Sequence, residues 1–166
     1  MANKDLERIR ESFKPERINV LFVGESPPRA GFFYDIGGEK SLSHFTRQAF
    51  EEVYQVKYRN KQDFLQDFKD KGCYLVDLFT ERSKKFNKAT REEKQQATVE
   101  LSTFVQKHKP KAIIAVLKRI GKLVSVVAEE AQVPCYVLPF PSYGRQSEYK
   151  EKLKNTLRSI SRHSLA

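Results

Sequence analysis

The chain has few of the residues that build metal centres, with two cysteines and three histidines among its 166 residues. Cys73 and Cys135 each lie inside an apolar run, and they do not form a Cys-x-x-Cys motif. Two thiols cannot supply the four ligands of a structural zinc ion or an iron–sulfur cluster. We therefore expect no metal or other cofactor, and we interpret both cysteines as buried, reduced thiols in a reducing compartment.

Long hydrophobic runs are also missing. No stretch approaches the roughly 18 apolar residues of a membrane-spanning helix. The segment Met1–Arg8 lacks the apolar core of a secretory signal. We expect a cytoplasmic protein without a membrane partner.

The sequence has neither Gly-x-Gly-x-x-Gly after a strand nor Gly-x-x-x-x-Gly-Lys-Ser/Thr, which argues against a dinucleotide-binding motif and a P-loop. Without a repeat or a linker, the length predicts a single domain over residues 1–166.

Positive charge is present in excess. Lys and Arg number 31 against 21 Asp and Glu, so the net charge is +10. Such a balance attracts polyanions over long range, and nucleic acid is the natural candidate. Charge alone leaves two alternatives open, a protein that binds nucleic acid and one that does not, because many basic proteins bind no nucleic acid.

Four nearly continuous apolar runs alternate with helical patterns. The runs are Ile18–Val23, Cys73–Phe79, Ala112–Leu117 and Val133–Leu138. Runs of this kind are typical of parallel strands buried on both faces. The helical patterns are Leu42–Val53, Gln62–Lys69, Arg91–His108, Arg119–Ala131 and Ser147–Arg162, with a short helix expected before the first run. The alternation predicts an α/β fold whose parallel sheet is covered by helices on both faces.

The residues that follow each predicted strand are candidate site residues, because open parallel sheets bind ligands beyond the carboxyl ends of their strands. These segments are Gly24–Pro28, Asp77–Glu81, Lys118–Arg119 and Pro139–Arg145. They are rich in charge, aromatic rings, Gly and Pro, which plain connecting loops do not need. The pattern favours a functional edge.

The first of these segments carries a candidate catalytic group. Gly24 allows a tight turn or a close approach to a ligand, and Pro27 and Pro28 stiffen the chain that follows. Glu25 is then held on a rigid turn, where a carboxylate can activate water or stabilise a developing cation. The alternative is a solvated loop glutamate.

Two further segments have the composition of a ligand-contacting surface. Three consecutive rings, Phe32, Phe33 and Tyr34, are not expected to fit into a core from one short loop, so at least one should stack on a flat ligand such as a base. The alternative is that two of them anchor the loop. The Pro-Ser turn at Ser142 precedes a basic helix, where backbone N–H groups and Arg145 can bind phosphate. An ordinary capped loop is the alternative there.

Four segments together resemble the uracil-DNA glycosylase superfamily. They are Val20–Pro27 (VLFVGESP), Cys73–Leu78 (CYLVDL), Ala112–Leu117 (AIIAVL) and Leu138–Ser142 (LPFPS). With their flanking helices they cover nearly the whole chain. The resemblance implies a three-layer α/β/α sandwich with a four-stranded parallel sheet in the order 2-1-3-4. It also implies base flipping, by which such enzymes reach an atom inside a duplex.

The resemblance also implies site residues. The first motif is similar to the Gly-Glu-Ala-Pro-Gly version of the thermophilic branch, and Glu25 would there assist the water that attacks the sugar. The implied substrate-binding residues are Gly24, Ser26, Pro27, Phe32, Phe33, Asp77 and Phe140, with Phe32 or Phe33 as the ring that stacks on the flipped base. Ser142 would contact the DNA backbone, and Tyr143 or Arg145 would enter the hole left in the duplex.

Two positions depart from the family pattern. Asp77 stands where the family has a base-reading Asn, and a carboxylate offers only acceptors. A protonated Asp77, its pKa raised by burial, could read uracil, whereas an ionised one suits a base with an amino group. Phe140 replaces a His and can do no proton chemistry. The branch that binds an iron–sulfur cluster needs four cysteines, so no cluster is expected.

Three further candidates are weaker. Lys118 could face the site, and His44 is the one histidine near it in sequence. The basic run Lys84–Lys88, followed by Arg91, could contact a DNA backbone, or it could be a solvated loop.

Three functions fit these observations. The first is a monomeric DNA glycosylase of base excision repair, acting on uracil or another damaged base. The second is a catalytically lapsed protein on the same fold that binds nucleic acid or nucleotides. The third is a different small-molecule hydrolase, because a fold does not fix a function.

Overall fold

The computed structural model describes residues 3–164 and contains a four-stranded, all-parallel sheet. Its strands are β1 (Val20–Gly24), β2 (Cys73–Asp77), β3 (Ala112–Ala115) and β4 (Cys135–Val137). The strand order is β2-β1-β3-β4, which confirms the predicted order 2-1-3-4. The strands are shorter than the apolar runs that predicted them, because residues at the ends of those runs lead into loops.

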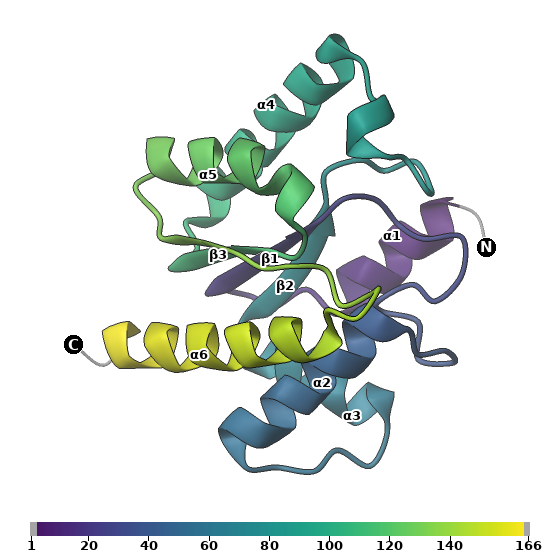
Figure 1. Cartoon of the computed structure of the whole chain (residues 1–166), viewed down its shortest axis with the longest axis vertical. Coiled ribbons are helices and arrows are strands. Elements are labelled where there is room, and N and C mark those ends of the chain that lie inside the picture. Colours follow the sequence, from purple (N-terminus) through teal and green to yellow (C-terminus); the bar gives the residue numbers. More distant parts are fainter. Residues whose placement is uncertain (1–2, 165–166) are drawn as a thin grey trace.

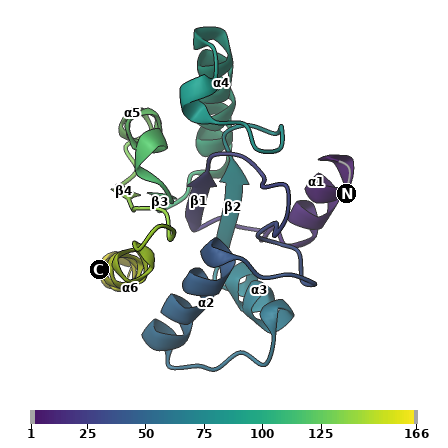
Figure 2. The same ribbon diagram turned by 45° about the vertical axis from the view of Figure 1, so that its right-hand side comes forward.

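Helices cover both faces of the sheet. They are α1 (Asn3–Ser12), α2 (Ser41–Tyr54), α3 (Lys61–Asp70), α4 (Arg91–His108), α5 (Gly121–Glu130) and α6 (Gln146–Ser164), with short 3₁₀ turns at Phe86–Lys88 and Lys118–Ile120. Figure 1 and Figure 2 show α4 and α5 on one face and α2, α3 and α6 on the other, with α1 beside the β2 edge. The three-layer α/β/α architecture is therefore confirmed. The predicted helix Arg119–Ala131 is divided into a 3₁₀ turn and α5.

The core lies on both sides of the two central strands. Leu21, Phe22 and Val23 of β1 and Ile113 and Ile114 of β3 are completely buried. This explains why their sequence shows no polar alternation. Because all four strands run in one direction, their carboxyl ends meet at one edge. In the sheet register, Gly24 lies opposite Asp77 and Val23 lies opposite Ala115.

The outer edge of β2 is closed by side chains. The Tyr34 hydroxyl accepts a hydrogen bond from the Leu75 N–H (2.6 Å) and donates one to the Leu75 carbonyl (3.1 Å). Arg10 of α1 donates to the same carbonyl at 2.9 Å. An edge strand leaves such groups unpaired unless something covers them. These contacts tie both α1 and the loop after β1 to β2.

The two cysteines are free thiols. Cys73 is buried as expected, and its burial raises the pKa of the thiol to about 12. Cys135 lies on the edge strand β4 and is only half-buried, so that part of the prediction is wrong. Measured against the length and apolar content of a bilayer-spanning helix, none of the helices within residues 3–164 qualifies.

Candidate functional site

A cavity of about 360 Å³ opens at the carboxyl ends of β1, β2 and β3. Its volume lies in the range of small-molecule sites, and its position is the one expected for an open parallel sheet. The loop after β1 forms much of its wall. The predicted residues that line it are Gly24, Glu25, Ser26, Phe32, Phe33, Asp77 and Phe140. Residues far apart in the sequence therefore meet in one cavity.

Glu25 is a nearly buried carboxylate with fixed partners. Its side chain is 9% exposed, and its Oε2 atom lies 3.0 Å from Nε of Arg119 in an ion pair. The same oxygen accepts a hydrogen bond from the backbone N–H of Phe86 at 2.8 Å. Glu25 is therefore not a solvated loop residue. Two independent segments hold its carboxyl group at the cavity.

The residues after Glu25 are tied to the loop that follows β2. The Ser26 hydroxyl donates to the carbonyl of Lys84 at 2.8 Å. The carbonyl of Pro27 accepts from the backbone N–H of Ser83 at 2.8 Å. Ser26 lines the cavity, whereas Pro27 is buried beside it and does not. Pro27 therefore has a structural place in this turn.

Asp77 forms part of the cavity floor and is paired with a buried arginine. Its Oδ2 atom accepts a hydrogen bond from Arg10 at 3.0 Å, and both side chains are almost inaccessible. Burial raises the pKa of Asp77; the charge of Arg10 opposes this rise, and the negative charges of Glu7 and Glu25 add to it. Arg10 also lies over the ring of Phe32, 5.2 Å from its centroid.

Gly24 is required for the packing of this floor. A Cβ atom on residue 24 would lie 2.5 Å from Oδ1 of Asp77, too close for any side chain. The carboxylate has little freedom to move aside, because Arg10 holds its other oxygen. The group that comes close to the Gly24 backbone is therefore the Asp77 side chain.

The expectation that Phe32, Phe33 and Tyr34 cannot all be buried is wrong. Their exposed fractions are 5%, 4% and 0%. Segments on both sides supply the packing: Phe13, directly after α1, stacks on Tyr34, and Phe68 of α3 contacts Phe33. Phe32 and Phe33 nevertheless line the cavity, so they form its wall from within the core. Whether either ring stacks on a base stays a prediction.

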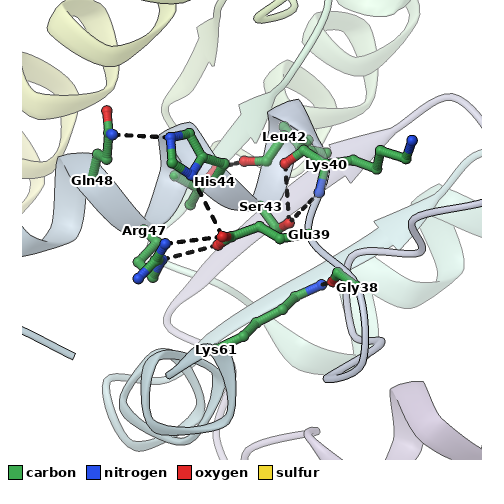
Figure 3. Close-up of polar contacts among 10 residues, drawn as sticks. Gly38, Glu39, Lys40, Leu42, Ser43, His44, Arg47, Gln48 and Lys61 are labelled. Atoms are coloured by element: carbon green, nitrogen blue, oxygen red, sulfur yellow. Dashed lines mark hydrogen bonds and ion pairs between the residues drawn. The ribbon is translucent and has the colours of Figure 1, made fainter. Parts of the chain in front are cut away.

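A buried lysine fixes the far end of the aromatic loop. Nζ of Lys61 donates to the carbonyls of Gly38 (2.6 Å) and Phe32 (3.2 Å). Figure 3 shows Lys61 reaching from α3 to Gly38. Burial lowers the pKa of Lys61 to about 8, and the negative charges of Asp35 and Glu39 oppose this shift. Lys61 therefore closes the loop through backbone contacts.

His44 belongs to a polar cluster beside the cavity. Glu39 accepts two hydrogen bonds from Arg47, both of 2.9 Å, and lies 3.5 Å from Nδ1 of His44 (Figure 3). The other ring nitrogen of His44 contacts Gln48 at 3.0 Å. His44 does not line the cavity, although Lys40, Ser41 and Leu42 of the same stretch do. Its contacts fit a role in holding the start of α2.

The turn after β4, residues 139–145, is more exposed. Phe140 lines the cavity and is 37% exposed, and Tyr143 is 99% exposed. Ser142, Tyr143 and Arg145 do not line the cavity. The backbone N–H of Ser142 bonds to Phe140 and that of Arg145 bonds to Ser142, so these two donors are used inside the turn.

Three residues that hold or line the cavity received no role from the sequence: Arg10 and Lys61 lie outside the candidate segments, and Arg119 was named only as part of Lys118–Arg119. Arg10 could have been noticed, because it interrupts the apolar stripe that runs from Leu6 of α1 to Phe13 in the turn after it. Arg119 follows a predicted strand, but its neighbour Lys118 was favoured; Lys118 instead lies 4.0 Å from Glu148 and outside the cavity lining. No sequence pattern around Lys61 indicated that its side chain would hold the loop.

The cavity is rich in positive charge. The cationic side chains that line it are Arg29, Lys40, Lys85 and Arg119. Lys85 comes from the basic run Lys84–Lys88, which places part of that run at the site. Within residues 3–164, no group of three or more His, Cys, Asp or Glu side chains is arranged to hold a metal ion.

A scan against models of known protein families gives no match to this chain, and a search of curated proteins finds no significant relative.

Proposed function

We propose that this chain is a DNA glycosylase-like protein that hydrolyses the N-glycosidic bond of uracil or another damaged base in DNA. The observation that carries the proposal is the cavity, which collects Glu25, Asp77 and Phe32 at one sheet edge. A paired carboxylate, a polar floor and aromatic walls suit a flipped nucleoside, whose base is flat and whose sugar carries the bond to be broken. The protein would act as a monomer in the cytoplasm.

The reaction needs one group that handles a proton, and Glu25 is suited to it. A water molecule attacks C1′ of the sugar while the C1′–N bond breaks and its electron pair passes to the base. Glu25 accepts the proton that the water loses, and that proton is finally taken up by the departing base. Arg119 and the Phe86 N–H both engage Oε2 of Glu25, which leaves Oε1 for the water.

Asp77 is suited to reading the base. Arg10 engages Oδ2, while Oδ1 lies against Gly24 at the cavity. An oxygen held in this way accepts a hydrogen bond from a ring N–H or an exocyclic amino group. The edge of the base is therefore expected to present a donor to Asp77.

DNA is the expected partner. The four cations of the cavity lining and the net charge of +10 favour a phosphate backbone. Tyr143 and Arg145 lie on an exposed turn beside Phe140, where they could contact the duplex from which a base has flipped.

An excision assay tests the proposal. Oligonucleotides that carry uracil, hypoxanthine, xanthine or a mismatch are incubated with the protein, and abasic sites are then cleaved with alkali. We expect strand breaks with at least one base, and a loss of about 10²- to 10⁴-fold in rate for Glu25→Gln, the range for removal of a general base. The matched control is Glu81→Gln, at an exposed glutamate that does not line the cavity.

The same assay addresses the catalytically lapsed alternative, which the presence of Phe140 at the cavity supports. DNA binding that weakens with salt, without any strand breaks, would favour a binding protein. Breaks that persist in Glu25→Gln would contradict the assigned role of Glu25. Absence of salt-dependent binding to every DNA would overturn both nucleic-acid functions, because phosphate contacts require that dependence.

A further inference from the structure

Cleavage of an N-glycosidic bond leaves negative charge on the base, and the cavity must supply a group that stabilises it. Histidine cannot do so here, because none lines the cavity within residues 3–164. The carboxylates of Glu25 and Asp77 have the wrong sign, and the rings of Phe32, Phe33 and Phe140 carry no strong donor. The serine hydroxyls of the lining are neutral donors, so only the cationic side chains bring positive charge to the departing base.

Arg119 is the cation whose position is fixed next to the reacting groups. It lies in the 3₁₀ turn Lys118–Ile120, between β3 and α5. Ile120 is completely buried, and a Cβ atom on Gly121 would lie 2.7 Å from Val137 of β4, so this backbone packs tightly against the sheet. The ion pair with Glu25 then holds the guanidinium at the cavity.

Arg119 still has donors for a ligand. The ion pair with Glu25 is made through Nε, which carries one of the five guanidinium N–H groups. The side chain is 47% exposed and lines the cavity, so the other N–H groups remain accessible. A guanidinium keeps its charge at all relevant pH values, and its planar fork matches a ring nitrogen with an adjacent oxygen.

We propose, on the basis of the function proposed above, that Arg119 is the catalytic residue that stabilises the departing base anion. As the C1′–N bond breaks, its electron pair moves into the base and spreads over the ring nitrogen and the carbonyl oxygens. The guanidinium donates hydrogen bonds to these atoms without transferring a proton. The proton that the base finally takes up comes from the attacking water, by way of Glu25. One side chain thus links the water-activating group and the leaving group.

Binding of free bases tests this role without requiring turnover. The probes are 5-nitrouracil, which is largely anionic at neutral pH, and uracil, which is neutral there; both are titrated by NMR. We expect the wild-type protein to bind anionic 5-nitrouracil at least roughly tenfold more tightly than neutral uracil, which is the size of effect expected of charge-assisted hydrogen bonds. The preference should disappear in Arg119→Gln and persist in the matched surface variant Arg158→Gln. A wild-type protein without the preference, or an unchanged preference in Arg119→Gln, would overturn the proposal.

Excision kinetics separate leaving-group stabilisation from mere positioning of Glu25. Arg119→Gln should slow the release of uracil more than that of 5-fluorouracil, because the latter is a better leaving group and needs less help. An equal slowing of both would mean that Arg119 only positions Glu25, and the proposal would fail although the glycosylase function stood. Anion preference that depends on Arg119, in a protein that excises no base, would instead support the anion site and contradict the proposed function.

Discussion

The two sides of the cavity are built in opposite ways. The anchored side, residues 24–40 and 77–86, is held by Arg10 and Lys61 from α1 and α3, and its aromatic residues are buried except for Phe86, which is half-buried. The open turn, residues 139–145, presents Tyr143 almost fully to solvent, and a Cβ atom on Gly144 would meet no atom within 4 Å. The anchored side suits a small ligand that must be held precisely. The open turn is free to meet a large partner.

The anchored side contains groups that are stable only with their partners. The side chains of Arg10 and Asp77 are only 5% and 9% exposed, and a buried charge that loses its partner is strongly destabilising. Tyr34 likewise satisfies both backbone groups of Leu75. No comparable buried charge lies in the open turn, where Arg145 is exposed. Substitutions on the two sides should therefore separate effects on stability from effects on binding.

The largest effect is expected from Arg10→Met. This change leaves the Asp77 carboxylate buried without its partner, and we expect a loss of about 3–5 kcal/mol in the free energy of unfolding. The measurement is urea denaturation followed by circular dichroism. Arg8→Met on the exposed face of α1 is the control, because Arg and Met have similar helix propensities.

A double variant sharpens this test. Arg10→Met combined with Asp77→Leu removes both charges and should recover much of the lost stability, because an apolar pair of similar volume often replaces a buried ion pair without loss. If Arg10→Met costs no more than Arg8→Met, the ion pair does not hold the anchored side, and the contrast with the open turn weakens.

A smaller effect is expected from the pH dependence that Lys61 contributes. Its pKa is lowered to about 8 in the folded state from an ordinary value of 10.5. Between these values the unfolded chain binds a proton that the folded protein has released, so the stabilising contribution grows as pH rises through this window and is lost as pH falls through about 8. The quantity to measure is the difference in unfolding free energy between the wild type and Lys61→Met from pH 7 to pH 10.5.

The unfolding free energies of the two proteins must be subtracted because tyrosines also make stability depend on pH. Burial raises the pKa values of Tyr58 and Tyr74, so their contribution to the free energy of unfolding falls as pH rises at the alkaline end, opposite in sign to that of Lys61. Both proteins share those contributions. A difference that stays flat over the window would show that the amine of Lys61 is not perturbed and that the loop does not depend on it. Lys57→Met, at an exposed loop lysine, is expected to give a flat difference.

Much of the fold could be predicted from the sequence, because it depends on local patterns. Apolar runs without alternation mark the four strands, although the edge strand β4 is only partly buried, and helix Arg91–His108 has the predicted bounds. The sheet-edge rule also placed Gly24, Glu25 and Asp77 at the cavity.

The partners of these residues could not be predicted in the same way. Arg10 meets Asp77 across 67 positions of sequence, and no local pattern specifies such a pair. The burial of Phe32, Phe33 and Tyr34 could not be predicted for a related reason. The loop sequence alone does not show the space that accepts its rings, which is formed by α3 and by Phe13 directly after α1.

The smallest effect on stability, and the clearest separation of the two sides, is expected from Tyr143→Ala. The side chain is 99% exposed, so the free energy of unfolding should change by no more than about 0.5 kcal/mol. Tyr143 has a φ of 52°, and Ala is strained there much as Tyr is, so this variant removes the ring without relieving the backbone. We expect weaker binding to DNA, with a salt dependence like that of the wild type, because a ring contributes no phosphate contact.

Arg145→Ala provides the complementary measurement, because it removes a charge from the same turn. Loss of one phosphate contact should reduce the slope of log K against log salt by about 1, whereas Tyr143→Ala should leave that slope unchanged. Arg158→Ala on α6 serves as the charge-matched control. If both turn variants bind DNA as the wild type does, the open turn is not the DNA-facing side, and its exposure reflects only the absence of packing.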